Sequence, residues 1–450
     1  MTKYENKDIV IPIDKDNISI TFSKDKCVEC GMCKNICCNE ITVGKMYDLK
    51  QTNDDPVCIN CGQCSNICPV DAICERYHYK EVKEIIKKHE KIVIISTAPA
   101  VRVALTEEFE NKIEFEEGKM VALLKELGAN YVLDVTFGAD MTIIEEAAEL
   151  TKKLQEESNR LPQFTSCCPA WVKYVEIFYP EFIKNLSTTK SPIAMQGITV
   201  KNYFAQKMEI NPKDILHVVI APCTAKKYEI NREEFVTNGL KDTDYVLTTR
   251  ELIKWVQEEN INFAELKDAS FDSIMGKGSG AGLVFGASGG VAQAVLRTVY
   301  YNITNSNPPD NLINLVEVQG LKGVKEATVN IGDKSIKVCV IQGMSNAKRI
   351  LDSMNENEYS NYDFIEVMAC TGGCAGGGGQ PKLPMLNAKE SKQTRMNLLY
   401  ENDSKMQNRF SYLNFEALRA YSDFYGEPLG EKAQKMLHTK YENKSYFLGK

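Results

Sequence analysis

Eight cysteines in the first seventy residues form two runs with the same spacing, C-x2-C-x2-C-x3-C. The runs are Cys27, Cys30, Cys33 and Cys37, followed by Cys58, Cys61, Cys64 and Cys68. Thiolates at such spacings bind iron–sulfur clusters or zinc. A four-cysteine zinc site needs neither a third cysteine at C-x2 spacing nor a second copy of the fourth cysteine. The pattern therefore favours iron–sulfur clusters, with zinc as the alternative.

The tandem runs resemble the bacterial two-cluster ferredoxin module, in which the fourth cysteine of each run ligates the other cluster. The resemblance implies one [4Fe-4S] cluster held by Cys27, Cys30, Cys33 and Cys68, and a second held by Cys58, Cys61, Cys64 and Cys37. Cys37 is followed by Cys38 where proline is usual. Either of these two thiols is open as the ligand, and the spacing favours Cys37.

Four later cysteines, in three separate segments, lie after expected strands or in loops. They are Cys168, Cys223, Cys370 and Cys374. Ligands of α/β sheets bind outside the carboxyl ends of the strands, so these loops could converge on one site. Four thiolates from three loops would hold a third [4Fe-4S] cluster.

The elements that must position these loops are strands alternating with helices from residue 91 onward. Apolar, β-branched runs at 92–95, 131–135, 216–220, 338–341 and Phe364–Met368 predict buried strands, with amphipathic stretches between several of them. We therefore expect an α/β architecture for this part of the chain. Residues 81–90 have apolar positions at helical spacing and read as a linker helix.

Three segments carry a more specific resemblance. TSCCPAW at 165–171, PCTAKKYE at 222–229 and EVMACTGGCAGGGGQP at 366–381 look like the signature segments of [FeFe]-hydrogenases, in the family's order. The resemblance implies an α+β protein with a ferredoxin-like domain (1–80), the linker helix (81–90), a two-lobed α/β catalytic domain with the cluster between its lobes (91–385) and a helical closing segment (386–450). It also implies reversible reduction of two protons to H2.

The family's active site is a [4Fe-4S] cluster joined through a cysteine sulfur to a diiron unit that carries CO, cyanide and an azadithiolate bridge. By resemblance, the later cysteines hold the cubane, and Cys374 bridges to the diiron unit. Cys167 is the thiol that exchanges protons with the bridge amine, and Lys226 donates to a cyanide. The residues that would line the cofactor further are Ala98, Pro99, Pro222 and Met368.

Glu146, Glu149 and Lys153 lie at spacings of three and four, so they share one face of an expected helix. From the residues alone, a solvated charged face is the competing interpretation. In the family, protons pass from the thiol through a glutamate, a serine and a second glutamate, positions that Glu146, Ser187 and Glu149 occupy. The resemblance therefore favours a proton relay.

Four residues depart from the family pattern close to the diiron site. Ala221 replaces a methionine, Ala225 and Ala100 replace serines, and Ile193 replaces a frequent glutamine. Such changes tune the potential and ligand basicity of a metal without abolishing its binding. We expect a divergent subgroup with an altered bias between making and consuming H2.

Composition limits the partners and the compartment. The net charge is −7, from 54 Lys and Arg against 61 Asp and Glu, so nucleic acid is an unexpected partner. Apolar stretches are too short for membrane insertion. The start, MTKYENKDIV, has no signal core, and sixteen cysteines are typical of a reducing compartment, so we expect a cytoplasmic protein.

Two other functions compete with the enzyme. A hydrogen sensor would carry the same cofactor but usually lacks the relay thiol, and an iron–sulfur assembly protein of the hydrogenase-like family tends to lack that thiol and the cyanide-binding lysine. The presence of Cys167 and Lys226 favours the enzyme. It would need ferredoxin or flavodoxin as electron partner, and dedicated maturation proteins to supply the diiron unit.

Overall fold

The computed structural model describes residues 4, 6–156, 158, 160–319, 321–355, 361–384 and 386–449. Its longer helices are α1 (Met32–Asn39), α3 (Tyr79–Lys87), α5 (Gly118–Glu126), α6 (Val135–Gln155), α7 (Pro169–Phe178), α8 (Pro192–Thr199), α11 (Thr249–Glu259), α13 (Gly290–Thr304), α14 (Met344–Asn355), α15 (Ala388–Lys405) and α17 (Glu431–Leu437). Short helices are α2 (Gln63–Ile67), α4 (Leu105–Phe109), α9 (Ala205–Lys207), α10 (Ala225–Glu229), α12 (Gly280–Val284) and α16 (Phe415–Ala420). The model is a mixed helix and sheet protein, which confirms the expected fold class.

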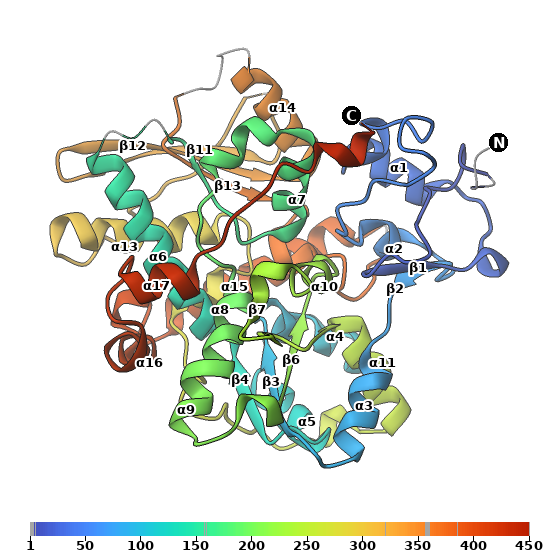
Figure 1. Ribbon diagram of the computed structural model, residues 1–450, viewed down its shortest axis with the longest axis horizontal. Coiled ribbons are helices and arrows are strands. Elements are labelled where there is room, and N and C mark those ends of the chain that lie inside the picture. The colour runs from blue at the N-terminus through green and yellow to red at the C-terminus, as the bar shows by residue number, and fades with distance from the viewer. Residues whose placement is uncertain are drawn as a thin grey trace.

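The N-terminal region is small and carries both cysteine runs. Strand β1 (Ile20–Phe22) pairs antiparallel with β2 (Ile73–Glu75), and the helices α1 and α2 lie between them in sequence. Each of these helices begins inside one cysteine run, so each run is partly loop and partly helix. The region lies at the upper right of Figure 1, beside the larger remainder of the chain.

The first large sheet has four parallel strands in the order β4-β3-β6-β9. They are β3 (Ile92–Thr97), β4 (Tyr131–Asp134), β6 (Ile215–Ala221) and β9 (Tyr245–Thr248). Apolar side chains of α3, α4, α5 and α11 cover one face, and those of α6, α8, α16 and α17 cover the other. The loops that follow β3 and β6 leave from the same edge because the strands are parallel.

The second large sheet has the order β10-β11-β12-β13-β5 and lies at the upper left of Figure 1. Its strands are β5 (Gln163–Phe164), β10 (Val316–Glu317), β11 (Val324–Ile331), β12 (Lys334–Gln342) and β13 (Phe364–Met368). β12, β13 and β5 are parallel, while β10, β11 and β12 are antiparallel. Helices α7 and α14 pack on one face, and α6 and α13 on the other. A separate small hairpin pairs β7 (Val236–Thr237) with β8 (Leu240–Lys241).

Helix α6 belongs to both cores. Its residues Phe137 and Met141 pack with the first sheet, whereas Ile143 and Leu150 pack with the second. The helix begins where β4 ends because the Asp134 side chain accepts the backbone N–H of Thr136, which caps the helix. Residues 131–135 were expected to form a strand, so the observed strand is one residue shorter.

The C-terminal helices are fixed to α6 by buried polar groups. The Asp140 carboxylate accepts from the hydroxyls of Ser279 and Ser411 and from the amide of Asn414. One turn further, Glu145 accepts from the Tyr421 hydroxyl, and His438 lies within 3.1 Å of it. Beyond α17 the chain runs past α7 and ends near α1 (Figure 1).

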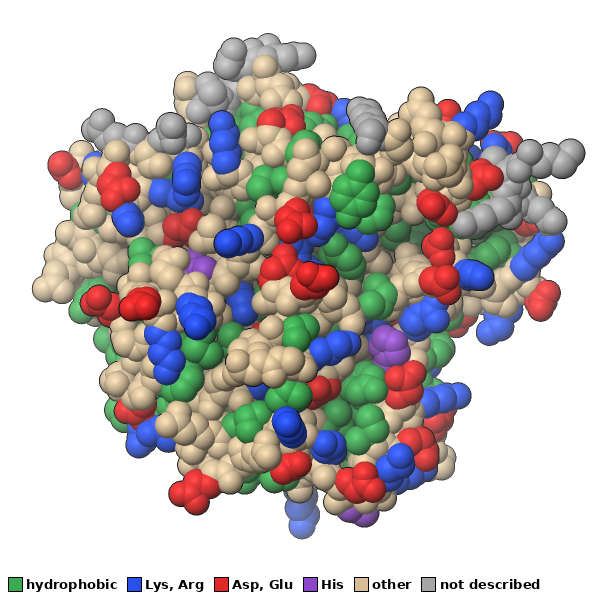
Figure 2. Space-filling model, viewed as in Figure 1, with side chains coloured by type: hydrophobic (Ala, Val, Ile, Leu, Met, Phe, Trp, Pro, Cys, Tyr) green, Lys and Arg blue, Asp and Glu red, His purple; other side chains and the backbone are tan. Residues whose placement is uncertain are grey.

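Most expected strands are present, and several others were not anticipated. β3, β6, β12 and β13 contain the four other expected runs, while β5, β9, β10 and β11 had no counterpart in the sequence analysis. The linker helix is observed as Tyr79–Lys87, against an expected 81–90. Within the described part of the chain, no helix combines the length and apolar character that a membrane span requires. On the face drawn in Figure 2, basic and acidic side chains are interspersed.

Candidate functional site

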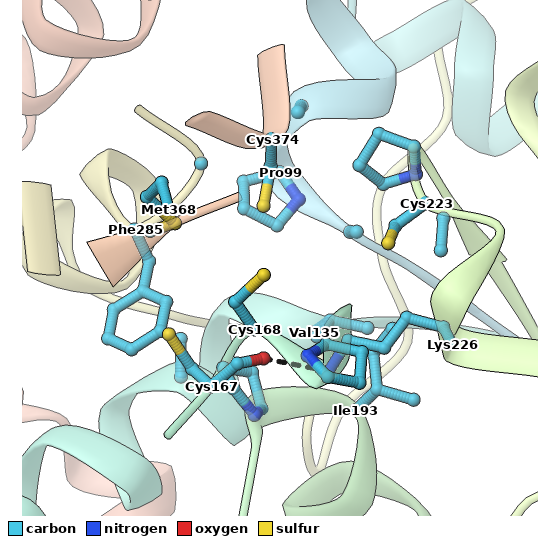
Figure 3. A pocket seen from close by; sticks show the side chains of 18 residues that line it. Pro99, Val135, Cys167, Cys168, Ile193, Cys223, Lys226, Phe285, Met368 and Cys374 are labelled. Atoms are coloured by element: carbon cyan, nitrogen blue, oxygen red, sulfur yellow. Dashed lines mark hydrogen bonds between the residues drawn. The ribbon is translucent and has the colours of Figure 1, made fainter. Parts of the chain in front are cut away.

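A cavity lies where loops from both large sheets meet. Its wall includes the loop after β3, the loop after β6, the segment between β5 and α7, and the segment after β13, together with residues of α6 and α8 and the end of α12. Of the residues singled out in the sequence, it includes Ala98, Pro99, Cys167, Cys168, Pro222, Cys223, Lys226, Met368 and Cys374. Figure 3 shows the labelled sulfur atoms of this set around one space.

The thiols of the later cysteines lie close together, and burial penalises the ionisation of Cys223, Cys370 and Cys374. Burial raises the pKa of Cys223 well above its usual range, and the neighbouring charges of Cys370 and Cys168 raise it further. Burial likewise raises the pKa of Cys370 to about 11 and that of Cys374 to about 12. Without a cation to neutralise them, these groups would therefore stay protonated at neutral pH.

Lys226 brings a positive charge to the cavity wall. Its Nζ donates to the backbone oxygen of Cys167 across 3.0 Å, drawn as a dashed line in Figure 3, and to the Glu229 carboxylate across 2.8 Å. Burial alone would lower the pKa of Lys226, but the Glu229 carboxylate holds it above its usual value. The ammonium is therefore retained, with donor capacity left for an acceptor in the cavity.

Behind Cys167, α6 carries the two glutamates of the expected relay. Glu146 is buried, and burial together with the Glu149 charge raises its pKa to about 8, although the Lys153 charge and the nearby Ser187 hydroxyl partly oppose this rise. Ser187 donates to Glu149 across 2.8 Å, and Lys153 pairs with Glu149 at 2.9 Å. Because Glu146 and Lys153 are both buried, the alternative of a solvated charged face is wrong.

Some site residues were not foreseen. Glu229 holds Lys226, and Phe285 and Pro192 line the cavity. The pairing of Lys226 with Glu229 has a sequence signal, since the two stand three apart on α10, but Phe285 reaches the cavity from a distant segment. Of the four departures from the family pattern, Ala100, Ile193 and Ala221 line the cavity, whereas Ala225 is buried outside the lining.

The N-terminal cysteines lie in two groups, and the crossed assignment of clusters to them stays a prediction. One small cavity is lined by Cys27, Cys30, Cys33 and Cys68. In the other group, burial raises the pKa of Cys64, and the charges of Cys58 and Cys37 raise it further, while burial raises the pKa of Cys37 to about 12. The Cys38 sulfur instead lies against Gly44, where an added Cβ would come within 2.7 Å of it. This geometry favours Cys37 as the ligand.

The donor sets fit iron–sulfur cubanes. Each set offers four cysteine sulfurs from loops and short helices, and cysteine thiolates are the usual ligands of such clusters. The larger cavity has room beyond its cysteines, and its wall combines apolar groups with a single retained ammonium. A cubane with an attached group that carries hydrogen-bond acceptors fits this arrangement.

Comparisons with known proteins agree with the geometry. A family model described as iron only hydrogenase large subunit, C-terminal domain, matches residues 91–378, and one described as iron hydrogenase small subunit matches residues 389–444. Iron hydrogenase 1 of Clostridium pasteurianum is 40% identical over 97% of this chain and 78% of that protein. The periplasmic [Fe] hydrogenase large subunit of Nitratidesulfovibrio vulgaris is 42% identical over 84% of this chain and 90% of that protein.

A solved structure gives the same result for the fold. A variant of apo [FeFe]-hydrogenase HydA1 from Chlamydomonas reinhardtii is similar with a TM-score of 0.73 and 36% identity, covering 82% of this chain and 99% of that chain. More distant relatives have another role. Cytosolic iron-sulfur assembly component 3 of Mus musculus is 28% identical over 80% of this chain and 76% of that protein.

Proposed function

The chain belongs to the iron-only hydrogenase family, and on this premise we propose that it catalyses the reversible combination of two protons and two electrons into H2. Electrons pass through two [4Fe-4S] clusters to or from ferredoxin or flavodoxin. The observation that carries the proposal is the convergence of Cys168, Cys223 and Cys374 on a cavity whose wall also includes Cys167 and Lys226.

The proposed cofactor set has three parts. The N-terminal cysteines would hold two cubanes in the crossed arrangement, and Cys168, Cys223, Cys370 and Cys374 would hold a third, with Cys374 as the residue that would also hold a diiron unit. When bound, the diiron unit supplies the open iron at which protons and electrons combine. The chain supplies the wiring, the proton path and a shielded pocket.

The proposed proton path uses Cys167, Glu146, Ser187 and Glu149. Glu149 takes a proton near the surface and gives it to the Ser187 oxygen, while the Ser187 hydroxyl, which donates to Glu149 in the structure, turns and gives its own hydrogen to Glu146. Glu146 holds that proton at a buried carboxyl, because burial raises its pKa to about 8. Cys167 carries it at Sγ into the cavity, where ionised thiolate is penalised by burial.

Lys226 orients the cofactor in this proposal. Its ammonium is fixed by Glu229 and by the backbone oxygen of Cys167, and its remaining donor would be available to a cyanide ligand. A buried anionic acceptor forms a charge-assisted hydrogen bond with such a group. Pro99, Pro222 and Met368 enclose the same space with apolar surface.

The domain organisation is part of the proposal. Residues 1–80 form the ferredoxin-like domain, 81–90 the linker helix, 91–385 the catalytic domain and 386–450 the closing segment. The family matches at 91–378 and 389–444 support the last two boundaries. Separate maturation proteins deliver the diiron unit, because the side chains named in this site cannot synthesise CO or cyanide.

We place the enzyme in the cytoplasm. The chain has sixteen cysteines, all free thiols in the structure, and a reducing compartment keeps such thiols available for metal. Membership of the family does not fix the compartment, because the relative from Nitratidesulfovibrio vulgaris is named periplasmic.

The test is anaerobic H2 turnover in both directions, with a redox dye, on the full chain carrying its cubanes and diiron unit. Cys167→Ala should lower turnover about 10³-fold, the range for loss of a general acid–base group. Cys339→Ala removes a fully buried thiol from β12, away from the site, and should keep turnover. A loaded chain without turnover would favour a sensor, and a chain that takes up cubanes but no diiron unit would favour an assembly role.

A further inference from the structure

One side chain joins the N-terminal region to the cubane-binding cysteines. Gln63 lies between Cys61 and Cys64, and its Nε2 donates to the sulfur of Cys370 across 3.1 Å. The same Nε2 donates to the backbone oxygen of Gly376, also across 3.1 Å. The Gln63 side chain is buried, so the contact is not exchanged with water.

The surrounding loops are in backbone contact at the same place. A Cβ on Gly378 would come within 2.1 Å of the Cys61 carbonyl oxygen, so the loop after β13 touches the second cysteine run directly. A Cβ on Gly62 would come within 2.3 Å of the Thr224 hydroxyl. That hydroxyl, next to Cys223, donates to the backbone oxygen of Asn60 across 2.7 Å. Two of the three cubane-binding segments therefore meet one turn of the N-terminal region.

Arg250 holds this junction in place from α11. Its guanidinium donates to Ser65 at 2.9 Å and to Glu75 at 2.7 Å, which are both N-terminal residues. It also donates to the backbone oxygens of Gly378 and Gln380, at 2.7 and 2.6 Å. The rigid, planar guanidinium of Arg250 thus fixes the N-terminal region relative to the loop after β13. Because the two sides are fixed, the Gln63 side chain is held in one position against Cys370.

We propose that Gln63 tunes the active-site cubane through its N–H···S bond to Cys370, and so sets how easily electrons pass between that cubane and the cluster held by Cys61 and Cys64. This inference rests on the proposed function, because it takes Cys370 as a cubane ligand. Hydrogen bonds to the sulfurs of an iron–sulfur cluster stabilise its reduced, more negative state and raise its potential. A donor on Cys370 therefore makes the cubane easier to reduce.

The test measures the midpoint potential of each cubane, by EPR-monitored redox titration of the full chain with three cubanes and no diiron unit. Gln63→Met keeps a similar length but removes the N–H donor. The expected result is a lower midpoint for the cubane at Cys370. Gln63→Leu also lacks a donor, should lower the same midpoint, and serves if the methionine variant does not fold.

Gln342→Met is the matched control. Gln342 accepts the backbone N–H of Gly372 across 2.9 Å, so it anchors the same loop without a contact to sulfur. Its replacement should leave the midpoint unchanged. Equal midpoints in the Gln63 variants and the unaltered chain would overturn the proposal, as would an equal fall in the Gln342 variant, which would assign the effect to loop relaxation. A missing third cubane in the unaltered chain would instead contradict the proposed function itself.

Discussion

The hydroxyl of Ser187 donates to the Oε2 of Glu149 across 2.8 Å, although the two residues are 38 positions apart. Ser187 follows β5 and α7, whereas Glu149 lies on α6, so the contact exists only in the folded chain. The backbone N–H of the next residue, Thr188, also donates to Glu149. The carboxylate is thereby held against the serine, with Lys153 on its other oxygen.

Ser187→Ala should interrupt the proton path. The variant loses the group between Glu149 and Glu146, so H2 turnover should fall by about 10² to 10⁴. The EPR signals of the cubanes should remain, because no ligand is touched. Thr151→Val is the control. Thr151 lies on α6, as Glu149 does, but its hydroxyl donates to the Ala147 backbone oxygen and not to a residue of the path. Equal turnover in the two variants would remove Ser187 from the path.

Glu146→Gln should change how stability depends on pH. Burial raises the pKa of Glu146 from 4.5 to about 8 in the folded chain, so its stabilising contribution is complete below pH 4.5 and is lost as pH rises through 8. Between these limits, the free energy of unfolding of the unaltered chain should fall relative to the variant by up to about 1.4 kcal/mol per pH unit. Urea denaturation at several pH values measures this difference.

Glu401→Gln, on the exposed side of α15, controls for the loss of one carboxylate. Its unfolding free energy should run parallel to that of the unaltered chain over the same pH range. If the Glu146 variant also runs parallel, the buried carboxyl is not protonated at neutral pH, and it cannot store a proton for the path.

Lys226→Met should prevent retention of the diiron unit. The variant removes the ammonium from the cavity wall and leaves Glu229 as a buried, uncompensated carboxylate, at a cost of about 3–5 kcal/mol in stability. Adding Glu229→Gln should recover most of the stability without recovering the diiron unit. Infrared bands of the bound cyanide, together with thermal unfolding, separate the two effects.

Lys201→Met is the control for that experiment. Lys201 is also buried and pairs with Asp244, but it lies outside the cavity lining. It should destabilise the chain and still retain the diiron unit. Retention in the Lys226 variants would mean that the ammonium does not contact the cofactor.

Arg250→Met should weaken the attachment of the N-terminal region. Glu75 is 2% exposed, so loss of its partner leaves a buried charge, which costs about 3–5 kcal/mol. Arg250→Lys should recover only part of this, because an ammonium cannot reproduce the fork. Arg419→Met breaks an exposed pair with Asp423 and should change stability by about 1 kcal/mol or less. Thermal unfolding ranks the stabilities of the three variants. Full recovery of stability in Arg250→Lys would contradict the role of the planar guanidinium.

The sequence predicted the strands with continuous β-branched runs. β6 and β13 are buried along their whole length, and their residues are apolar except for His217 and Glu366. β5 has only two residues, and its pairing with β13 depends on a contact between residues 201 positions apart in sequence, as at Phe364 and Gln163. β11 largely alternates buried and exposed residues, so it contains no continuous apolar run.

The candidate site was predictable where spacing carries chemistry. The cysteine positions follow from ligand geometry and from resemblance, and the structure brings Cys168, Cys223 and Cys374 to one cavity. Contacts across the fold were not predictable in this way. Gln63 and Cys370 are 307 positions apart, and nothing local to either residue marks the contact. Likewise, the charged face of α6 is buried because the helix lies between two sheets, which its own sequence does not reveal.

The attachment of the C-terminal helices to α6 should not depend on the concentration of the protein. The segment that matches the small-subunit model, 389–444, is part of the same polypeptide as the segment that matches the large-subunit model. Its docking on Asp140 and Glu145 is therefore a unimolecular event, with an effective concentration in the millimolar range that tethered segments reach. An interface built on buried hydrogen bonds should consequently stay closed at any working concentration of the chain, whereas the same contacts between separate polypeptides would open on dilution.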